Sequence, residues 1–458
     1  MNGFLVLFVY ALLMMATTLV FTKKAVDAEK FHVADRKIPI GVSAMSIAAT
    51  WVWAPALFVS GQQAYTNGIP GMFWFLVPNV LCLMLFIPFA KRIRQEFPQG
   101  ITLAGYMAEK YKSNKVKGIY SFQLGALAVL STSVQLLAGS KILSMITGLP
   151  FWSMTLLLAV IAYSYSQFSG IKAAVATDTL QMAIILGGCA LLVPWALKMN
   201  GGVSTLIDGL GSITGNMNSL TSETGLAVFL GFGLPTAIGL TSGPFGDQSF
   251  WQRAFSIRKE HIGKAFFYGA LLFALVPMSM GAMGFIAAGS GFKASDVGMV
   301  NFEFISSIFP TWVLVPFLFM ILSGLLSTVS SNLCAAASMT SDFRTGSDIK
   351  KSKLVMIALL VVAIGIANIP GLTVTYMFLF YGTLRASTLL PTVMTLLGKK
   401  LSAQGVFIGI LISLCVGLPI FAYGNIFNVA LYKTIGSLTT VLMSGIVAVL
   451  ASRKAVRA

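Results

Sequence analysis

Five hydroxyl side chains lie close together in the segment 311–339, which carries no charge. They are Ser323, Ser327, Thr328, Ser330 and Ser331. At about 100° per residue of an α-helix, the four serines fall within an arc of roughly 100°, with Thr328 just beside it. Serines that bond to the carbonyl of the preceding turn, or that let two helices approach closely, explain two or three such residues more easily than five. The alternative is a stripe of oxygen ligands.

A second source of oxygen is the apolar segment 41–64, which has Pro55 near its centre. A helix that is interrupted there leaves backbone carbonyls free, and such carbonyls can coordinate a cation or a solute. Neutral carbonyls and hydroxyls suit a small monovalent cation, whereas a divalent ion normally recruits several carboxylates. The two segments together therefore predict an all-oxygen site for a monovalent cation.

Asp178 and Arg385 are charged side chains inside apolar segments. A charge in the membrane is costly and by default marks an ion or proton path, which makes Asp178 a further ion-site candidate. Its structural alternative is a salt bridge to Arg385. Arg385 could hold a carboxylate substrate with two hydrogen bonds, or it could neutralise an acid or backbone carbonyls.

The composition places these residues in a membrane protein. Of the 458 residues 57% are hydrophobic and 10% are charged, whereas soluble domains carry about 25% charged residues. The formal charge of +17 does not indicate nucleic acid, because the basic residues cluster in short gaps between apolar segments. The two histidines and four cysteines show no metal-ligand spacing. We therefore expect the chain to lie in a lipid bilayer.

Apolar segments of about 20 residues predict an all-α integral membrane protein with thirteen transmembrane helices. They lie near 2–22, 41–64, 70–90, 118–146, 150–168, 172–198, 226–250, 264–290, 311–339, 354–369, 371–396, 405–424 and 432–452. The gaps on one side hold 26 of the 31 Lys and Arg residues and the opposite gaps hold three. By the positive-inside rule the N-terminus is outside and the C-terminus is cytoplasmic. We expect a multi-pass protein of the plasma (inner) membrane.

The segments 41–64 and 226–250 are both interrupted by proline or glycine. The second contains Pro235, Gly239, Gly243 and Pro244. The two lie five spans apart and run in opposite directions, which is the pattern of a transporter with inverted repeats. Packing of small residues between helices is the structural alternative.

Four motifs resemble the sodium:solute symporter family, which includes sodium-coupled proline, sugar, sialic acid, pantothenate and urea transporters. They are FHVADRKIP (31–39), GIKAAVATDTLQ (170–181), FGDQSFWQR (245–253) and LLSTVSSN (325–332). The resemblance implies a LeuT-like core of 5+5 inverted repeats, preceded by one helix and followed by two. The implied divisions are an N-terminal helix and cytoplasmic loop (1–40), repeat 1 (41–198), an extracytoplasmic loop (199–225), repeat 2 (226–396), and two C-terminal helices with a tail (397–458).

The resemblance also implies an ion site. The family's shared sodium ligands match the carbonyls of Ala49, Val52 and Gly324 and the hydroxyls of Ser327 and Thr328. Some relatives hold a second sodium, and the matching positions are Asp178, Ser327, Ser330 and Ser331. The implied mechanism is alternating access, in which Na⁺ steadies the junction between the first broken helix and the serine-rich helix.

For the solute, the candidate contacts on the first broken helix are Trp51, Trp53 and Ala56. The Trp-x-Trp pattern resembles the urea and polyamine branch of the family. Ala56 stands where sugar and sialic acid carriers place a Gln, which disfavours a large polyol. The second break and the pathway helix add further candidates, namely Thr241, Ser242, Gly243 and Arg385. If Arg385 faces the pocket, a monocarboxylate or an amino acid becomes the better expectation than urea.

The predicted function is sodium-coupled import of a small polar organic solute, urea-like or a small amino acid, with Na⁺ as coupling ion. A sodium-coupled monocarboxylate symporter is the alternative, and a sodium-independent facilitator or channel is a further one. An enzyme is not expected, because the membrane segments contain no histidine and no helix carries paired acids. A monomer is expected to suffice, and the sequence leaves the oligomeric state open.

Overall fold

The protein is described by a computed structural model over residues 3–25, 27–342 and 348–457. Residue 2 of the expected first helix and part of the expected 340–353 connection lie outside these ranges. The described chain is helical, and its only β-type pairing is an isolated bridge between Ile38 and Ile257. The prediction of an all-helical protein is confirmed.

Nine helices in the described ranges are long and apolar enough to cross a membrane. They span Gly3–Phe21, Val59–Glu96, Asn114–Thr147, Ile171–Met199, Glu223–Thr241, Lys259–Gly289, Thr311–Ser341, Ala403–Ile426 and Ala430–Arg453. The prediction of a multi-pass membrane protein is therefore confirmed.

The other expected crossings correspond to shorter or more polar elements. These are α8 (Phe151–Ser169), α18 (Ile349–Ala367) and the pair α19 (Val374–Ala386) and α20 (Leu389–Leu396), together with the broken segment described next. The count of thirteen crossings stays a prediction.

The first break lies at Val52 and Trp53. Helix α3 (Ile40–Trp51) ends there, and Trp53 is extended, with φ −105° and ψ 176°. The short α4 (Ala54–Leu57) then begins with Pro55 in its first turn, where proline's missing N–H is no loss. Helix α5 (Val59–Glu96) follows and contains a non-helical residue, Gly68, with φ +55°. A single expected span thus becomes α3, α4 and the start of α5.

The second break occupies the segment after α11 (Glu223–Val228). A π-helical turn, η3 (Phe229–Gly233), leads into α12 (Leu234–Thr241), and α13 (Gly243–Gly246) carries Pro244 in its first turn. After the extended residue Asp247 the chain forms α14 (Gln248–Ser256), in which every residue is buried. The sequence predicted a polar connection from residue 251, so this buried helix is a correction.

The serine-rich helix α17 (Leu314–Ser338) lies at the centre of the bundle, and all its residues from Met320 to Ser338 are buried. It packs against α3 and against α7 (Asn114–Thr147), α8 and α9 (Ile171–Met199). Helix α15 (Ile262–Gly289) packs along α3 and α5. The fold therefore surrounds the hydroxyl stripe with protein on every side.

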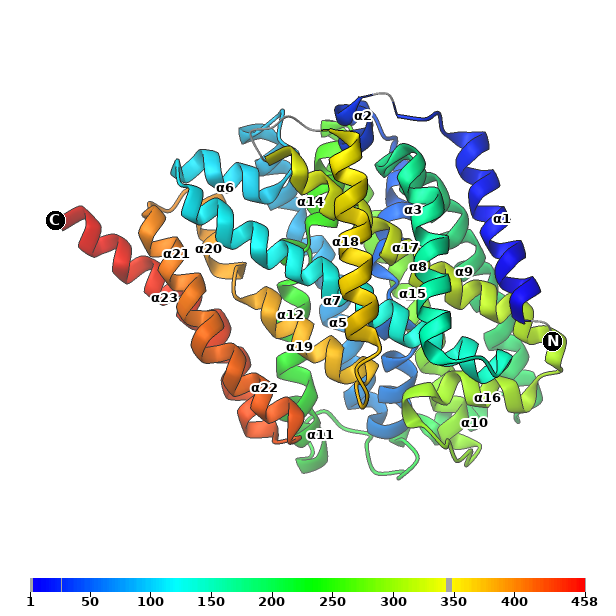
Figure 1. Ribbon diagram of the computed structural model, residues 1–458. Coiled ribbons are helices and arrows are strands. Elements are labelled where there is room, and N and C mark those ends of the chain that lie inside the picture. Colours follow the sequence, from blue (N-terminus) through cyan, green and yellow to red (C-terminus); the bar gives the residue numbers. More distant parts are fainter. Residues whose placement is uncertain (1–2, 26, 343–347, 458) are drawn as a thin grey trace.

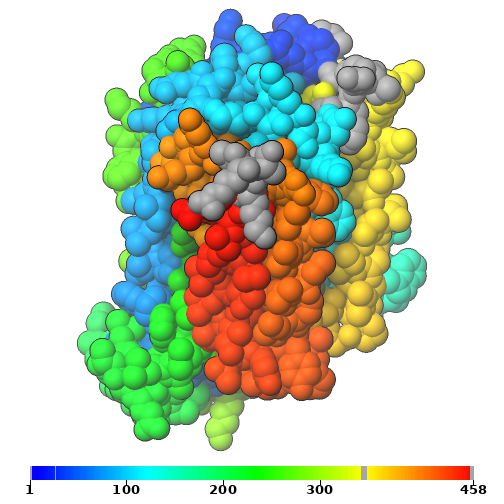
Figure 2. Space-filling model, turned by 90° about the vertical axis from the view of Figure 1, so that its left-hand side faces the viewer, coloured from blue at the N-terminus to red at the C-terminus, as the bar shows by residue number. Residues whose placement is uncertain are grey.

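The ends and flanks of the bundle are formed by shorter helices. At one end lie α10 (Val203–Asp208), α11 and α16 (Val300–Ile308), and at the other lie α2 (Ala28–Val33) and α6 (Leu103–Tyr111) (Figure 1). Helix α1 (Gly3–Phe21) lies at one edge. The last elements, α21 (Ala403–Ile412), η8 (Ser413–Gly417), α22 (Leu418–Ile426) and α23 (Ala430–Arg457), cover one flank (Figure 2).

Candidate functional site

The hydroxyls of α17 meet the broken end of α3. Ser327 Oγ donates to the carbonyl of Ala49 at 2.8 Å and to that of Gly324 at 3.1 Å. Thr328 Oγ1 donates to the carbonyl of Thr50 at 3.1 Å and to that of Gly324 at 3.2 Å. Four of the five expected ligand residues are thus in direct contact, and Thr50 joins them.

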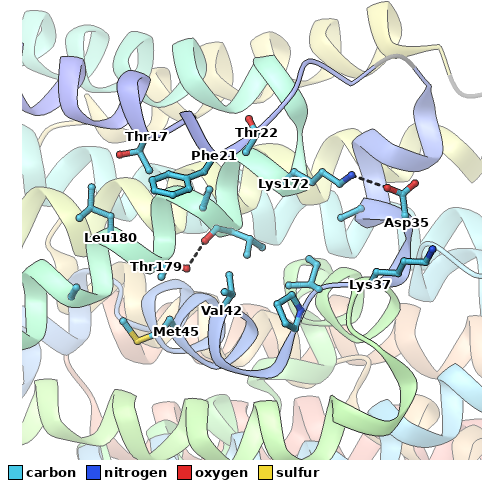
Figure 3. Close-up of a pocket in the computed structure, with 16 residues that line it drawn as sticks. Thr17, Phe21, Thr22, Asp35, Lys37, Val42, Met45, Lys172, Thr179 and Leu180 are labelled. Carbon is cyan, nitrogen blue, oxygen red and sulfur yellow. Dashed lines mark hydrogen bonds and ion pairs between the residues drawn. The ribbon is translucent and has the colours of Figure 1, made fainter. Parts of the chain in front are cut away.

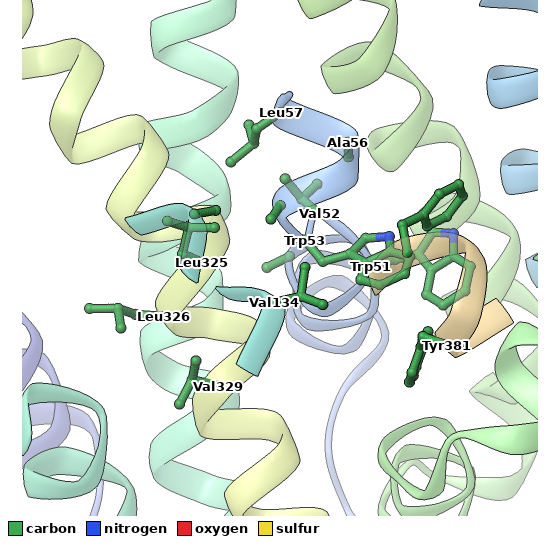
Figure 4. Close-up of a cluster of buried hydrophobic side chains, with 14 of the residues drawn as sticks. Trp51, Val52, Trp53, Ala56, Leu57, Val134, Leu325, Leu326, Val329 and Tyr381 are labelled. Atoms are coloured by element: carbon green, nitrogen blue, oxygen red, sulfur yellow. The ribbon is translucent and has the colours of Figure 1, made fainter. Parts of the chain in front are cut away.

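The fifth expected ligand residue, Val52, lies beside Gly324. A Cβ placed on Gly324 would lie 3.2 Å from the carbonyl oxygen of Val52 and 2.8 Å from Leu57 Cδ1, so a side chain there would push the two helices apart. Glycine is therefore what lets the break approach α17 this closely. Figure 4 shows Val52 of the first break and Leu325 of α17 in one cluster of buried apolar side chains.

All the polar atoms in this cluster are neutral oxygens, from carbonyls and hydroxyls. Such a set fits a small monovalent cation better than Mg²⁺ or Ca²⁺, which recruit carboxylates. Both hydroxyls now donate to carbonyls, so a bound cation would require them to turn their lone pairs toward it. The cluster has the right ligand types for Na⁺.

Asp178 forms a buried ion pair, but its partner is Arg253 and not Arg385. Asp178 Oδ2 lies 2.8 Å from Arg253 Nη2 and accepts from Ser46 Oγ at 2.6 Å. Both charged side chains are at most 2% exposed. The structural alternative of a salt bridge is therefore present, but Arg385 is the wrong partner, because α14 brings Arg253 into the bundle.

The expected second-ion residues are only partly brought together. Arg253 Nη2 also donates to Ser331 Oγ at 2.7 Å, so Asp178 and Ser331 share one cationic group. Ser330 Oγ donates to the carbonyl of Ser327 on its own helix at 2.9 Å. Asp178 Oδ1 is buried and has no hydrogen-bond partner among the described residues. A second ion at these residues stays a prediction.

Sequence reasoning missed Arg253 because it counted the residue among the basic side chains of a cytoplasmic connection. The signal was present in two places. Arg253 closes the FGDQSFWQR motif, and a buried Asp178 requires a buried partner of opposite charge.

The two helix breaks meet at Arg385. Its Cζ lies 5.3 Å from the ring centre of Trp51, 5.6 Å from that of Trp53 and 4.5 Å from that of Tyr381. Its Nε donates to the carbonyl of Gly239 at 2.7 Å. Figure 4 shows the two tryptophans and Tyr381 on the same side of the first break.

Gly243 belongs to the same cluster. A Cβ at this position would overlap Trp51 Cη2 and would lie 3.4 Å from Arg385 Nη1. Of the seven expected solute contacts, Trp51, Trp53, Gly243 and Arg385 are therefore brought together. Tyr381, which joins them, was not anticipated, although it lies one helical turn before Arg385.

The other three expected contacts are turned to their own helices or are less buried. Ala56 donates its N–H to the Trp53 carbonyl at 2.9 Å, and its own carbonyl accepts from Ser60 Oγ. Ser242 Oγ donates to the carbonyl of Ile238 at 2.8 Å. Thr241 is half-buried. The structure gives none of these three a hydrogen bond to the Arg385 guanidinium.

A cavity of about 570 Å³ approaches this cluster from the end of the bundle where α11 lies. Its lining includes Gln62, Phe232, Leu379 and Lys433. Phe378 packs against Phe232 with ring centres 6.4 Å apart and against Trp53 with ring centres 5.4 Å apart. An aromatic layer thus separates the cavity from Arg385.

A larger groove of about 760 Å³ lies between α1, α3 and α9 and is lined mainly by apolar side chains (Figure 3). Its polar rim includes the ion pair of Lys172 and Asp35, at 2.7 Å. None of the clustered residues described above lines this groove, so we do not place the solute there.

Comparisons with known proteins show the family of this chain. A sequence model of the sodium:solute symporter family matches residues 31–413. The urea active transporter of Saccharomyces cerevisiae is 25% identical over 442 residues, covering 86% of this chain and 59% of that protein. The sodium-coupled monocarboxylate transporter 2 of Mus musculus is 25% identical over 341 residues, covering 69% of this chain and 53% of that protein. The chain thus spans little more than half the length of these relatives.

A similar fold is found in the substrate-bound, outward-open structure of a Na⁺-coupled sialic acid symporter. The TM-score is 0.77 at 18% sequence identity, and the match covers 98% of both chains. At this identity the likeness concerns the fold.

Proposed function

The chain belongs to the sodium:solute symporter family, and from that premise we propose that it is a secondary active symporter that couples the import of a small polar organic solute to Na⁺. The observation that carries the proposal is the contact between the α17 hydroxyls of Ser327 and Thr328 and the carbonyls at the broken end of α3. That contact gathers neutral oxygen ligands where two separate helices meet.

In this proposal Na⁺ is held by the carbonyls of Ala49, Val52 and Gly324 and by the two hydroxyls. An ion there would bridge α3 and α17 and would favour the conformation in which they lie together. Trp51 follows Ala49 by two residues, so a proposed Na⁺ ligand and a proposed solute contact belong to the same turn of α3. Each ligand can then stabilise the conformation that binds the other, which is the requirement for coupling.

For the architecture we propose thirteen crossings, with two inverted repeats at 41–198 and 226–396. Residues 1–40, 199–225 and 397–458 are then the flanking helix and loop, the outer connection and the C-terminal pair. The two breaks, at Val52–Trp53 and around Ser242, support this division. The distribution of Lys and Arg supports an outside N-terminus and a cytoplasmic C-terminus, and we place the protein in the plasma (inner) membrane.

We propose transport rather than catalysis, with one chain as the working unit. The described residues contain no group of three or more His, Cys, Asp or Glu side chains that could hold a metal ion. A sodium-independent channel or facilitator would not need oxygen ligands at a helix break. The family's relatives in the comparisons are transporters.

Two solute classes follow from the relatives, and each is proposed for a different reason. The yeast relative is a urea transporter, and a urea-like solute matches the Trp-x-Trp pattern at Trp51 and Trp53, whereas a small amino acid would need Arg385 to face the solute. The mouse relative is a monocarboxylate transporter, and the position of Arg385 between the two breaks favours that alternative.

The proposal is tested by uptake into liposomes that contain the purified protein. An inward Na⁺ gradient should drive accumulation of at least one solute from a panel of urea, small amino acids, monocarboxylates and sugars. The same gradient made with choline should not. Equal uptake under both gradients would favour the facilitator.

A further inference from the structure

We propose that Arg385 binds the carboxylate of the transported solute, so that the solute is a small carboxylate, either a monocarboxylate or an amino acid, and not a neutral urea. This inference rests on the proposed symport function and names the substrate class of the same site.

The guanidinium presents one free edge. Its Nε is used by the carbonyl of Gly239 at 2.7 Å, whereas Nη1 and Nη2 are buried and have no hydrogen-bond partner among the described residues. The side chain is 0% exposed, so water in the surrounding solvent does not reach it. Two parallel N–H groups on one edge are the geometry that grips both oxygens of a carboxylate.

No carboxylate among the described residues forms an ion pair with Arg385. The buried Asp178 is paired with Arg253 at 2.8 Å. Asp247 follows Gly246, which packs against Arg385, but one of its oxygens accepts from Ser249 and the other accepts from the Tyr381 hydroxyl at 3.3 Å. A buried cation without a counter-ion is costly, and an arriving anion would remove that cost.

The aromatic rings around the guanidinium stabilise it only partly. Trp51, Trp53 and Tyr381 all lie within 5.6 Å of Cζ, which gives cation–π contacts but leaves the hydrogen-bonding edge unused. Trp53 Nε1 is a further buried donor without a partner among the described residues. Three buried donors in one cluster, Nη1 and Nη2 of Arg385 and Nε1 of Trp53, thus have no acceptor among the described residues.

The position of this edge fits a solute site. In transporters with inverted repeats, discontinuous helices form the substrate site near the middle of the membrane. Arg385 contacts both broken segments of this chain: Trp51 and Trp53 in the first, and Gly239 in the second. The cavity of about 570 Å³ is lined by Phe232, and Phe378 packs against both Phe232 and Trp53. A solute that passes this aromatic layer arrives at the guanidinium.

Urea is the less suitable ligand for two physical reasons. Its single carbonyl oxygen offers the two N–H groups of the guanidinium edge fewer lone pairs than the two oxygens of a carboxylate, and it carries no negative charge to neutralise the guanidinium. A site built to satisfy buried polar groups rejects a solute that leaves them unpaired.

The test compares acids with their amides in wild-type proteoliposomes under an inward Na⁺ gradient. Lactate and L-alanine are matched with lactamide and L-alaninamide, and urea is included. At least one acid should be taken up or should compete about 100-fold better than its amide and than urea. Sodium-driven uptake in which urea or an amide equals the acid would overturn the carboxylate assignment while leaving symport intact. Failure of Na⁺ to drive any solute would overturn the proposed function and this inference with it.

Variants of Arg385 locate the effect. Arg385→Gln should lose acid uptake by about 100-fold, and Arg385→Lys, which keeps the charge but loses the planar edge, by about 10-fold. Both variants should keep the increase in thermal stability that Na⁺ alone produces. The control variant Arg92→Gln, at an exposed position, should take up the acid as well as the wild type does. Unchanged acid uptake in Arg385→Gln would overturn the assignment. If the variants do not fold, the wild-type comparison of acids with amides decides.

Discussion

Replacing Ser327 by alanine removes one of the five proposed Na⁺ ligands and leaves the remaining cluster in place. The hydroxyl contacts the carbonyls of Ala49 at 2.8 Å and Gly324 at 3.1 Å, so it lies at the junction of the two helices. A hydrogen bond or dipole contact to a charged partner contributes about 1.5–3 kcal/mol, and 1.4 kcal/mol is about tenfold in affinity. Ser327→Ala should therefore weaken sodium binding by about 10- to 150-fold.

The assay is the sodium concentration that gives half-maximal solute uptake, together with the thermal stabilisation of the purified protein by Na⁺. Because stabilisation follows RT ln(1 + [Na⁺]/Kd), the curve should shift to higher sodium by the same factor. Ser166→Ala is the matched control, because that buried hydroxyl bonds only to Ala162 on its own helix, at 2.7 Å. A sodium dependence in Ser327→Ala equal to that of wild type and of the control would refute the assigned ligand.

Three further predictions test other parts of the protein. Asp178→Asn should lower the free energy of unfolding by about 3–5 kcal/mol, measured by thermal unfolding, because it leaves Arg253 buried without a counter-charge. If the folded variant keeps the wild-type ion-to-solute ratio, that result would count against a second ion at Asp178. Gly243→Ala should weaken solute binding roughly tenfold or more with sodium stabilisation retained, because the new methyl group would overlap Trp51; an unchanged half-saturating solute concentration would show that this wall is not part of the site. Burial lowers the pKa of His32 from 6.5 to about 4, so the unfolded chain takes up a proton that the folded protein excludes. Stability should therefore fall by up to about 3 kcal/mol as the pH drops from 7 to 4, and a His32→Gln variant with the same pH dependence would contradict this origin.

The helices could be predicted because apolar length alone fixes a membrane span. The long segments 118–146, 172–198 and 264–290 correspond closely to α7, α9 and α15. The breaks could be located through Pro55 and Pro244, which cannot continue a helical hydrogen-bond ladder. Hydropathy could not reveal α14, in which all nine residues are buried although five of them are polar. Polar residues can be buried when partners from distant segments satisfy their hydrogen bonds.

The hydroxyl cluster could be predicted for a local reason. Helical periodicity puts Ser327 and Thr328 near one face, and the proline break indicates the segment whose carbonyls are free. The family resemblance, and not the break itself, pointed to Ala49 as one of those carbonyls, and Ser327 contacts it. Ion-pair partners depend on which distant segments fold together, and periodicity says nothing about that. For this reason the sequence did not identify the pairing of Asp178 with Arg253, or Tyr381 as a neighbour of Arg385.

The central claim is that Na⁺ and the solute move together, and it is tested most directly by running the coupling in reverse. In proteoliposomes with no sodium gradient and the membrane voltage clamped at zero, an inward gradient of the transported solute should drive accumulation of ²²Na⁺, because coupling between two ligands is reciprocal. The accumulation should be strongly reduced in Ser327→Ala at low sodium. Equilibration of the solute without any movement of ²²Na⁺ would contradict the account.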